Sequence, residues 1–286
     1  MKILILGANG LIGSAFVHHL LNFSEHEILG TVRNSYLVES SSQTQARFLK
    51  DGVNALKLDT VIDTFKHFKP NLTINCIGVT KHRQHEVTRH DFIKLNSVLP
   101  HFLSQLCLSS GSRLIQISTD CVFSGSKGMY RETDLTDSKD LYGKSKAIGE
   151  MLNTNDTIIR TSTIGHETRT SFGLLEWFLS QQKSCKGFTK AIFSGLTSNY
   201  LASVVTELVI ENENITGLFN IASRPISKYH LLKTIAEIYS HQVKIEPCES
   251  LEINRSLDFS HFSSLTGYIA EDWRTQIERM YAMQRG

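Results

Sequence analysis

Residues 2–13 read KILILGANGLIG, and this segment indicates the architecture of the whole chain. It opens with a short apolar run, typical of a strand buried on both faces, and the amphipathic run at 14–22 predicts a helix behind it. Between them, Gly7 permits a sharp turn, Gly10 lets the backbone approach a pyrophosphate, and Gly13 lets helix pack on strand. The free N–H groups at the helix start then face the phosphates.

The pattern of strand and helix continues along the first half of the chain. Further strands are predicted at residues 27–32, 53–59, 72–78, 112–119 and 156–162, and helices at 60–70, about 90–110 and 135–153. Asp137 or Ser138 is predicted to cap the third of these helices. Such alternation predicts an α/β fold, a doubly wound parallel sheet of Rossmann type.

After Ser162 the alternation loosens. A helix containing Trp177 is predicted within 163–182, and the rest of this half is predicted to hold the helices 199–211, 227–239 and 271–283 and the strands 217–223 and 243–247. We therefore expect residues 1–163 to form an NAD(P)-binding domain, to which segments at about 190–225 return. Residues 164–286 are expected to form a smaller, mainly substrate-binding α/β part.

Composition and charge exclude several classes of protein. Of the 286 residues, 41% are hydrophobic and 20% charged, and the net charge of +2 favours neither nucleic acid nor an acidic membrane surface. No apolar stretch approaches the ~20 residues of a membrane span. Three glycines and the pair His18-His19 interrupt the apolar N-terminus, so we do not interpret it as a signal peptide. The scattered cysteines lack any CxxC and favour thiols in a reducing cytoplasm.

A candidate catalytic group lies within residues 117–146. Ser118 and Thr119 are predicted to end a strand, and Tyr142 and Lys146 are four residues apart, hence one turn apart on one helix face. An ammonium beside a phenol favours the phenolate and lowers the pKa of the tyrosine, which could then pass a proton near neutral pH. Thr119 could hold the oxygen that the tyrosine serves. An isolated YxxxK is more often a surface tyrosine beside a solvated lysine, so the motif depends on its context.

The end of the second predicted strand bears on the choice of cofactor. A NAD-specific fold usually has Asp or Glu there, to accept from the ribose 2′-hydroxyl. Here Arg33-Asn34 stands at that position. We interpret Arg33 as a partner of a 2′-phosphate, hence of NADPH, with NADH as the second candidate. The alternative is a solvated arginine on a turn.

Two other polar features are candidates for a functional role. The segment KHRQHEVTRH at 81–90 contains three histidines but not the HExxH arrangement of zinc enzymes, and no cysteine is near. We expect no metal there, and a loop that is solvated or meets a nucleotide's phosphates. Asn96 interrupts an apolar helix face, either as a hydrogen-bonding core residue, which we favour, or as part of a proton relay.

Taken together, these segments resemble the extended short-chain dehydrogenase/reductase family, and most of all its dTDP-4-dehydrorhamnose reductase branch. The resemblance runs nearly end to end. It rests on GANGLIG at 7–13, LD at 58–59, NCIG at 75–78, STDCVFSG at 118–125, YGKSK at 142–146, IIRTS at 158–162 and LDFSHFSSLTGY at 257–268.

The resemblance implies a reductase whose catalytic set is Thr119, Tyr142 and Lys146. It places Asp120 and Thr163, with Thr119, near the sugar. The residues expected at the cofactor are Gly7, Asn9, Gly10, Leu11, Ile12, Arg33, Asp59, Thr60, Cys76, Ile77, Gly78, Val79, Ile117, Tyr142 and Lys146. The implied activity is NADPH-dependent reduction of a nucleotide-linked 4-keto-6-deoxyhexose for cell-surface polysaccharide synthesis. No nucleic-acid or membrane partner is expected, and a homodimer is one assembly open to the chain.

The sequence departs from the branch at three places and leaves alternatives open. Cys121 stands where the branch usually has tyrosine, and KHRQHE at 81–86 replaces its usual VDKAE. The segment GLLEWFLSQQKSCKGFTKAIFSGLTS at 173–198 is not the branch's usual substrate loop. A dehydratase of this fold needs an Asp-Glu pair after the threonine, whereas Asp120 is followed here by Cys121. An epimerase retains NAD, which fits Arg33 less well. A non-catalytic subunit, similar to the regulatory subunit of methionine adenosyltransferase, is the alternative from another class.

Overall fold

The computed structural model describes residues 1–34, 48–83, 85–167 and 173–285. These residues fall into two compact units that are interleaved in sequence. Unit 1 comprises residues 1–118, 140–159 and 202–218, and unit 2 comprises residues 119–139, 160–201 and 219–286. The boundary expected from sequence, near residue 163, differs from this division because the segment 119–139 goes with unit 2.

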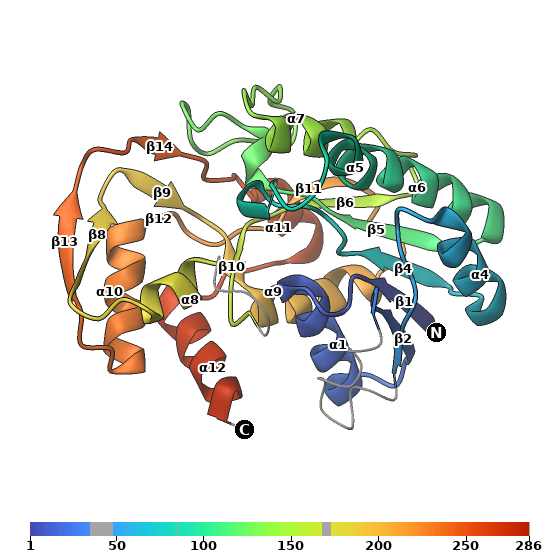
Figure 1. Ribbon diagram of the computed structural model, residues 1–286, viewed down its shortest axis with the longest axis horizontal. Helices are drawn as coiled ribbons and strands as arrows, with labels where there is room; N and C mark the ends of the chain where they lie inside the picture. Colours follow the sequence, from blue (N-terminus) through green and yellow to red (C-terminus); the bar gives the residue numbers. More distant parts are fainter. Residues whose placement is uncertain (35–47, 84, 168–172, 286) are drawn as a thin grey trace. The chain divides into compact units, whose positions relative to one another are not determined.

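A seven-stranded sheet forms the framework of unit 1 (Figure 1). Its order is β11-β6-β5-β4-β1-β2-β3, and the pairs from β6 through to β3 are parallel. The strands are β1 (Lys2–Leu6), β2 (Glu27–Thr31), β3 (Leu49–Lys50), β4 (Leu72–Asn75), β5 (Arg113–Ile117), β6 (Thr157–Arg160) and β11 (Gly217–Asn220). The chain runs outward in opposite directions from β1 and from β4, so the switch point between them is where such folds bind ligands. The predicted doubly wound α/β sheet is confirmed.

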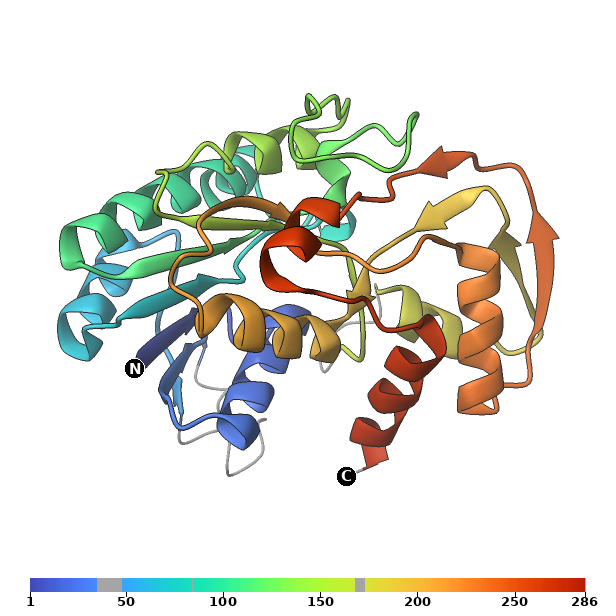
Figure 2. The same cartoon turned by 180° about the vertical axis from the view of Figure 1, so that it is seen from behind.

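Helices cover both faces of this sheet. Figures 1 and 2 show α4, α6 and α7 on one face and α1 and α9 on the other. Leu4 and Leu6 point to the first face, where they form a buried core with Phe65 of α4 and Leu103 of α6. The helical segments are α1 (Leu11–Phe23), α4 (Leu58–Phe68), α5 (Arg89–Ile93), the π-helical turn η2 (Lys94–Val98), α6 (Leu99–Ser110), α7 (Leu141–Ile148), α9 (Ser198–Val205) and the π-helical turn η4 (Thr206–Ile210).

The prediction of a strand at 53–59 is wrong. The third strand is the short β3, and α4 already begins at Leu58. The hydroxyl of Thr60 accepts from the amide of Asn54 at 2.9 Å and donates to the carbonyl oxygen of Lys57 at 2.8 Å. These bonds fold the segment into the entry of a helix, because a threonine hydroxyl competes with strand pairing for backbone groups.

The helix that carries Tyr142 and Lys146 is shorter than predicted. It begins at Leu141, and its cap is Asp140, whose side chain accepts from the amide of Gly143 at 2.9 Å. Neither Asp137 nor Ser138 caps it. The Asp137 carboxylate instead accepts from the amide and the hydroxyl of Ser124, both at 2.6 Å. The predicted cap failed because both aspartates are good caps and the polar run before the helix does not distinguish them.

In its described residues, unit 2 contains three small sheets and several helices. The sheets are β10-β7, β12-β9-β14 and β13-β8. Their strands are β7 (Thr163–Ile164), β8 (Ser184–Phe188), β9 (Ala191–Phe193), β10 (Leu196–Thr197), β12 (Ile226–Ser227), β13 (Lys244–Cys248) and β14 (Ile253–Asn254). The helices are α8 (Leu174–Leu179), α10 (Lys228–Tyr239), α11 (Ser260–Thr266) and α12 (Trp273–Arg285). Phe178, Leu231, Ile235 and Ile277 are fully buried members of its hydrophobic core.

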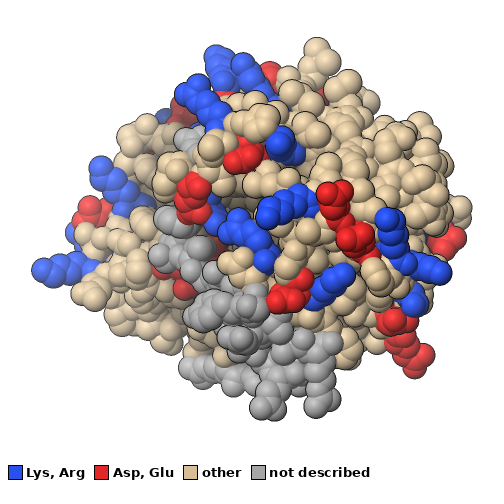
Figure 3. All heavy atoms as spheres, turned by 45° about the vertical axis from the view of Figure 1, so that its right-hand side comes forward, with Lys and Arg blue, Asp and Glu red and all other residues tan. Residues whose placement is uncertain are grey.

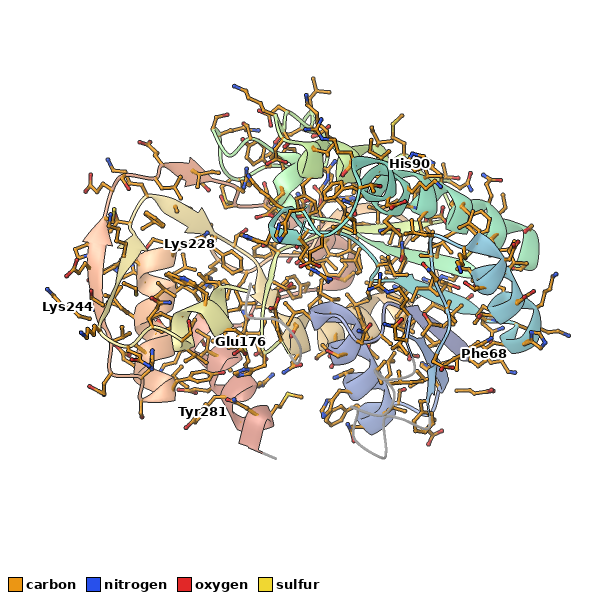
Figure 4. The ribbon with its side chains drawn as sticks, in the orientation of Figure 1. Phe68, His90, Glu176, Lys228, Lys244 and Tyr281 are labelled. Carbon is orange, nitrogen blue, oxygen red and sulfur yellow. The ribbon has the colours of Figure 1, made fainter. Side chains whose placement is uncertain are left out.

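A polar network joins three helices of unit 2 beside this core. His166 bonds through its two ring nitrogens to the carboxylate of Glu176 on α8 and the hydroxyl of Tyr239 on α10, both at 2.8 Å. The Tyr239 ring packs against Tyr281 of α12, with 4.7 Å between ring centroids. Figure 4 labels Glu176 and Tyr281 on their helices. The network supplies partners for groups that would otherwise be costly to bury.

The surface carries charges of both signs. Figure 3 shows lysine and arginine interspersed with aspartate and glutamate on the face in view, in keeping with the net charge of +2. Among the helices that the structure describes, none is both long and apolar enough to cross a membrane.

Candidate active site

The glycine turn after β1 has the geometry that its spacing predicted. Gly7 adopts φ 80°, which favours glycine, and a Cβ on Gly13 would lie 2.2 Å from the carbonyl oxygen of Gly7. The start of α1 therefore packs tightly on the turn. Gly10 is the N-cap residue, and no side chain caps the helix. The uncapped N–H groups and the helix dipole make this end of α1 suitable for a phosphate.

The end of β4 lies against the same turn. The amide of Cys76 donates to the carbonyl oxygen of Leu6 at 3.0 Å, and a Cβ on Gly7 would lie 3.3 Å from the backbone of Cys76 and Ile77. The structure thus brings together two of the predicted cofactor segments, residues 7–12 and 76–79. They meet at the switch point of the sheet, where a dinucleotide lies in folds of this type.

Asn96 fixes the position of Val79. Its side chain is fully buried in η2, accepts from the amide of Val79 at 2.9 Å and donates to the carbonyl oxygen of Val79 at 3.0 Å. The same amide group also donates to the hydroxyl of Ser145 on α7 at 3.2 Å. Asn96 therefore joins the end of β4 to the helix that carries Lys146, and its π-helical turn is of a kind often found at functional sites.

Lys146 points from α7 to the end of β5. Its side chain is 6% exposed, and Nζ donates to the carbonyl oxygen of Ile117 at 2.7 Å. A Cβ on Gly78 would lie 3.9 Å from that Nζ, so the lysine lies beside the end of β4. Burial lowers the pKa of Lys146 to about 8, and the carboxylate of Glu150 acts in the opposite direction. Tyr142, one turn earlier, packs edge-on against Phe92.

Ser118 and Glu150 form a contact that sequence reasoning missed. The hydroxyl of Ser118 donates to the carboxylate of Glu150 at 2.5 Å. Glu150 lies in the turn after α7, which ends at Ile148, so no helical spacing in the sequence pointed to this contact. Lys146 and Glu150 therefore bind consecutive residues, Ile117 and Ser118, at the end of β5.

Arg33, Asp59 and Thr60 are the other cofactor residues predicted in unit 1. Arg33 follows β2 and is exposed. The hydrogen bond with Arg83 is the main cause that holds the pKa of Glu86 below its ordinary range, and the charge of Arg33 acts in the same direction. Asp59 is exposed in the first turn of α4, and the Thr60 hydroxyl bonds within the loop before that helix. Among the described residues, neither side chain forms a hydrogen bond with the glycine turn, and the Thr60 hydroxyl bonds only to Asn54 and Lys57.

Unit 2 contains the predicted substrate residues. Thr119 donates to the carboxylate of Asp120 and accepts from the amide of Cys121, both at 3.1 Å. Burial raises the pKa of Asp120, while the charges of Arg255 and Lys228 act in the opposite direction. Arg255 also donates to the Cys121 sulfur at 3.8 Å.

The two cations near Asp120 come from distant parts of the chain. Arg255 follows β14, and Lys228 opens α10 (Figure 4), so no local pattern in the sequence could place them there. Thr163, the third predicted substrate residue, is half-buried at the start of β7, where it pairs with Leu196 of β10.

The histidines of the segment 81–90 do not gather with carboxylates or thiols. Within the described ranges, the structure contains no group of three or more His, Cys, Asp or Glu side chains placed to hold a metal ion. His90 lies in α5 (Figure 4), and Lys81–Arg83 form a short 3-10 helix. All five cysteines are free thiols.

The chain is similar to known proteins in both sequence and structure. A dTDP-4-dehydrorhamnose reductase of Aggregatibacter actinomycetemcomitans is 26% identical over 239 residues, which cover 80% of this chain and 76% of that protein. A methionine adenosyltransferase 2 subunit beta of Xenopus tropicalis is 26% identical over 260 residues, covering 84% and 72%. The crystal structure of a dTDP-4-dehydrorhamnose reductase from Clostridium acetobutylicum ATCC 824 matches with a TM-score of 0.82 over 100% of both chains. At 23% sequence identity, this likeness shows that the two proteins share a fold.

The family model of the RmlD substrate binding domain matches residues 1–285, almost the entire chain. The match agrees with the motifs at the glycine turn, at the strand ends and in α7, and it confirms the resemblance inferred from the sequence. The chain belongs to the RmlD substrate binding domain family, the dTDP-4-dehydrorhamnose reductase-like branch of the extended short-chain dehydrogenases/reductases.

Proposed function

We propose that this protein is an NADPH-dependent reductase of a nucleotide-linked 4-keto-6-deoxyhexose that serves cell-surface polysaccharide synthesis. Family membership supports an oxidoreductase, and the bacterial relative that is 26% identical is named a dTDP-4-dehydrorhamnose reductase. The observation that carries the proposal is the placement of Lys146, buried beside the ends of β4 and β5 and one helical turn from Tyr142.

In this proposal the cofactor binds to unit 1 and the sugar to unit 2. The glycine cradle fits a dinucleotide, because a Cβ at Gly10 would meet only the Gly7 carbonyl oxygen at 3.5 Å and the start of α1 is uncapped. The contacts proposed in unit 1 include Asn9, Leu11, Ile12, Asp59, Thr60, the segment 76–79 and Ile117. Arg33 pairs with the 2′-phosphate of NADPH, and NADH is the second candidate.

The chain's own groups would move one proton and hold one oxygen. NADPH, when bound, supplies a hydride to the keto carbon. Tyr142 donates its phenolic proton to the sugar oxygen, Thr119 donates a hydrogen bond to the same oxygen, and Lys146 stabilises the phenolate by its charge. A general acid is needed because hydride addition alone would turn the keto oxygen into an alkoxide. An alkoxide shielded from water and without a proton donor is costly to form.

Asp120 and Cys121 distinguish a reductase from a dehydratase of this fold. Elimination of water from the sugar needs an acid and a base in addition to the tyrosine. Asp120 is a buried carboxyl with a raised pKa, and the next residue is a partly buried thiol whose pKa is raised to about 12, mainly by desolvation. A protonated thiol of this kind is a poor base, so the pair favours reduction.

A binding subunit is the second candidate. It is favoured by the similarity to methionine adenosyltransferase 2 subunit beta over 84% of this chain. The purified protein should be incubated with NADPH or NADH and with dTDP- or UDP-linked 4-keto-6-deoxyhexoses, and loss of reduced-cofactor absorbance followed. The proposal expects turnover with one of these sugars and NADPH. Binding of NADPH with no turnover of any sugar would favour the binding subunit instead.

A further inference from the structure

Two consecutive residues at the end of β5 each bind a charged side chain from the region of α7. The carbonyl oxygen of Ile117 accepts from Lys146 Nζ at 2.7 Å, and the hydroxyl of Ser118 donates to Glu150 Oε1 at 2.5 Å. Glu150 lies in the turn that follows α7, and its bond to Ser118 brings its carboxylate next to the residue whose carbonyl oxygen binds Lys146. The end of β5 thus holds an ammonium and a carboxylate at neighbouring anchor points.

The buried ammonium needs a counter-charge. A charged group removed from water is costly unless an opposite charge or hydrogen bonds compensate for the lost hydration. Among the described residues, the groups that oppose the effect of burial on Lys146 are Glu150 first and Cys76 second. Burial raises the pKa of the Cys76 thiol to about 12, so it is uncharged near neutral pH. Glu150 is therefore the anion that can serve Lys146.

We propose that Glu150 is a positioning residue that keeps Lys146 protonated, and that Ser118 holds the Glu150 carboxylate in place for this purpose. The inference rests on the proposed function only in that Lys146 then serves Tyr142. A neutral lysine would not favour the phenolate, so loss of the Glu150 charge narrows the pH range in which the tyrosine can act.

Two substitutions separate this role from a structural tie between α7 and β5. Glu150→Gln keeps the shape and a carbonyl oxygen that can accept from Ser118, but removes the charge. Ser118→Ala keeps every charge but removes the hydroxyl that holds the carboxylate. Glu27→Gln is the matched control, because it removes one carboxylate from the same unit at an exposed position paired with Lys2.

The test is an NMR titration of Lys146 in the full chain labelled with ¹³C at lysine Cε. The Lys146 signal is assigned by its loss in Lys146→Arg. In the parent protein the midpoint is expected near pH 8, because burial lowers the pKa of Lys146 to about that value. Glu150→Gln is expected to move it to lower pH by about one unit, since a nearby opposite charge has an effect of that size. Glu150→Asp should restore most of the difference, and Glu27→Gln should leave the midpoint unchanged.

An unchanged midpoint in Glu150→Gln would overturn the inference. If that variant does not fold, Ser118→Ala decides: a lowered midpoint supports the role of Glu150, and an unchanged one contradicts it. The titration requires no substrate, so it is independent of the proposed reductase activity. A lowered midpoint without turnover of any keto sugar would support the Glu150 inference while the proposed function fails. Where turnover occurs, the alkaline fall of kcat should move with the midpoint.

Discussion

Lys146 donates a hydrogen bond to the carbonyl oxygen of Ile117 at 2.7 Å, which fixes a 6% exposed ammonium at the end of β5. The hydrogen bond to one neutral carbonyl oxygen replaces only part of the hydration that the ammonium has in water. The pKa of the lysine accordingly falls from the ordinary 10.5 to about 8, with burial as the main cause. This position for a lysine costs stability, and buried groups with pKa values shifted in this way cluster at functional sites.

Stability should reveal this cost through its dependence on pH. The folded-state pKa of Lys146 lies below the unfolded one, so the unfolded chain binds the extra proton between pH 8 and 10.5. The unfolding free energy of the parent protein, relative to that of Lys146→Met, should therefore rise with pH across this window, by about 3 kcal/mol. Urea unfolding of both proteins at several pH values measures the difference. A difference that is constant over the window would contradict the buried, titrating lysine.

Asn96 should be required for stability. Its replacement by alanine leaves the amide and carbonyl groups of Val79 without the partners they have in the structure. A buried polar group without a partner costs about 1–3 kcal/mol, so Asn96→Ala should lower the unfolding free energy by at least that amount. Asn22→Ala is the control, because the exposed Asn22 side chain donates only to a carbonyl oxygen of its own helix. Equal stabilities of the two variants would show that the bonds to Val79 are dispensable.

Two glycines of the first turn should respond differently to alanine. In Gly13→Ala the new methyl group meets the Gly7 carbonyl oxygen at 2.2 Å, so the helix must shift, at a cost of about 1–3 kcal/mol. In Gly10→Ala the methyl group lies 3.5 Å from that oxygen, an ordinary contact. Gly10→Ala should unfold close to the parent protein but bind NADPH more weakly, because the methyl group enters the proposed phosphate cradle. Unchanged NADPH affinity in a folded Gly10→Ala would remove the cofactor from this turn.

Arg33 should discriminate between the two nicotinamide cofactors. It is exposed at the end of β2, and a hydrogen bond to a charged group contributes about 1.5–3 kcal/mol. Arg33→Ala should raise KM for NADPH by about tenfold to a hundredfold and leave KM for NADH nearly unchanged. Arg274→Ala, on α12 of unit 2, is the control. Equal effects of Arg33→Ala on both cofactors would assign the arginine to another role.

Much of the fold, and the helix that carries Tyr142 and Lys146, could be predicted because short sequence patterns determine them. The apolar run at 2–6 and the glycines behind it predicted β1, the turn and α1, and the spacing of Tyr142 and Lys146 placed both on α7. The predictions that failed concerned segments where polar side chains compete for the same backbone groups. Thr60 turns a strand-like segment into a helix entry, and Asp140 caps α7 while Asp137 bonds to Ser124.

Other features depend on tertiary structure alone. Arg255 lies well over a hundred residues from Asp120 in the sequence, yet its charge acts on that carboxyl. The division of the chain between Ser118 and Thr119 is likewise invisible in the continuous motif STDCVFSG. Burial, and therefore the lowered pKa of Lys146, follows from how helices pack on the sheet, which periodicity does not specify.

The most direct test of the proposed reductase is Tyr142→Phe. Phenylalanine keeps the ring that packs against Phe92 but lacks the acidic hydroxyl. With the keto sugar that the parent protein reduces, kcat should fall by about a hundredfold to ten-thousandfold, the range for loss of a general acid, while NADPH binding stays nearly intact. Tyr229→Phe, on α10, is the control for the substitution itself. Turnover by Tyr142→Phe at the parent rate would contradict the assignment of Tyr142 as the proton donor.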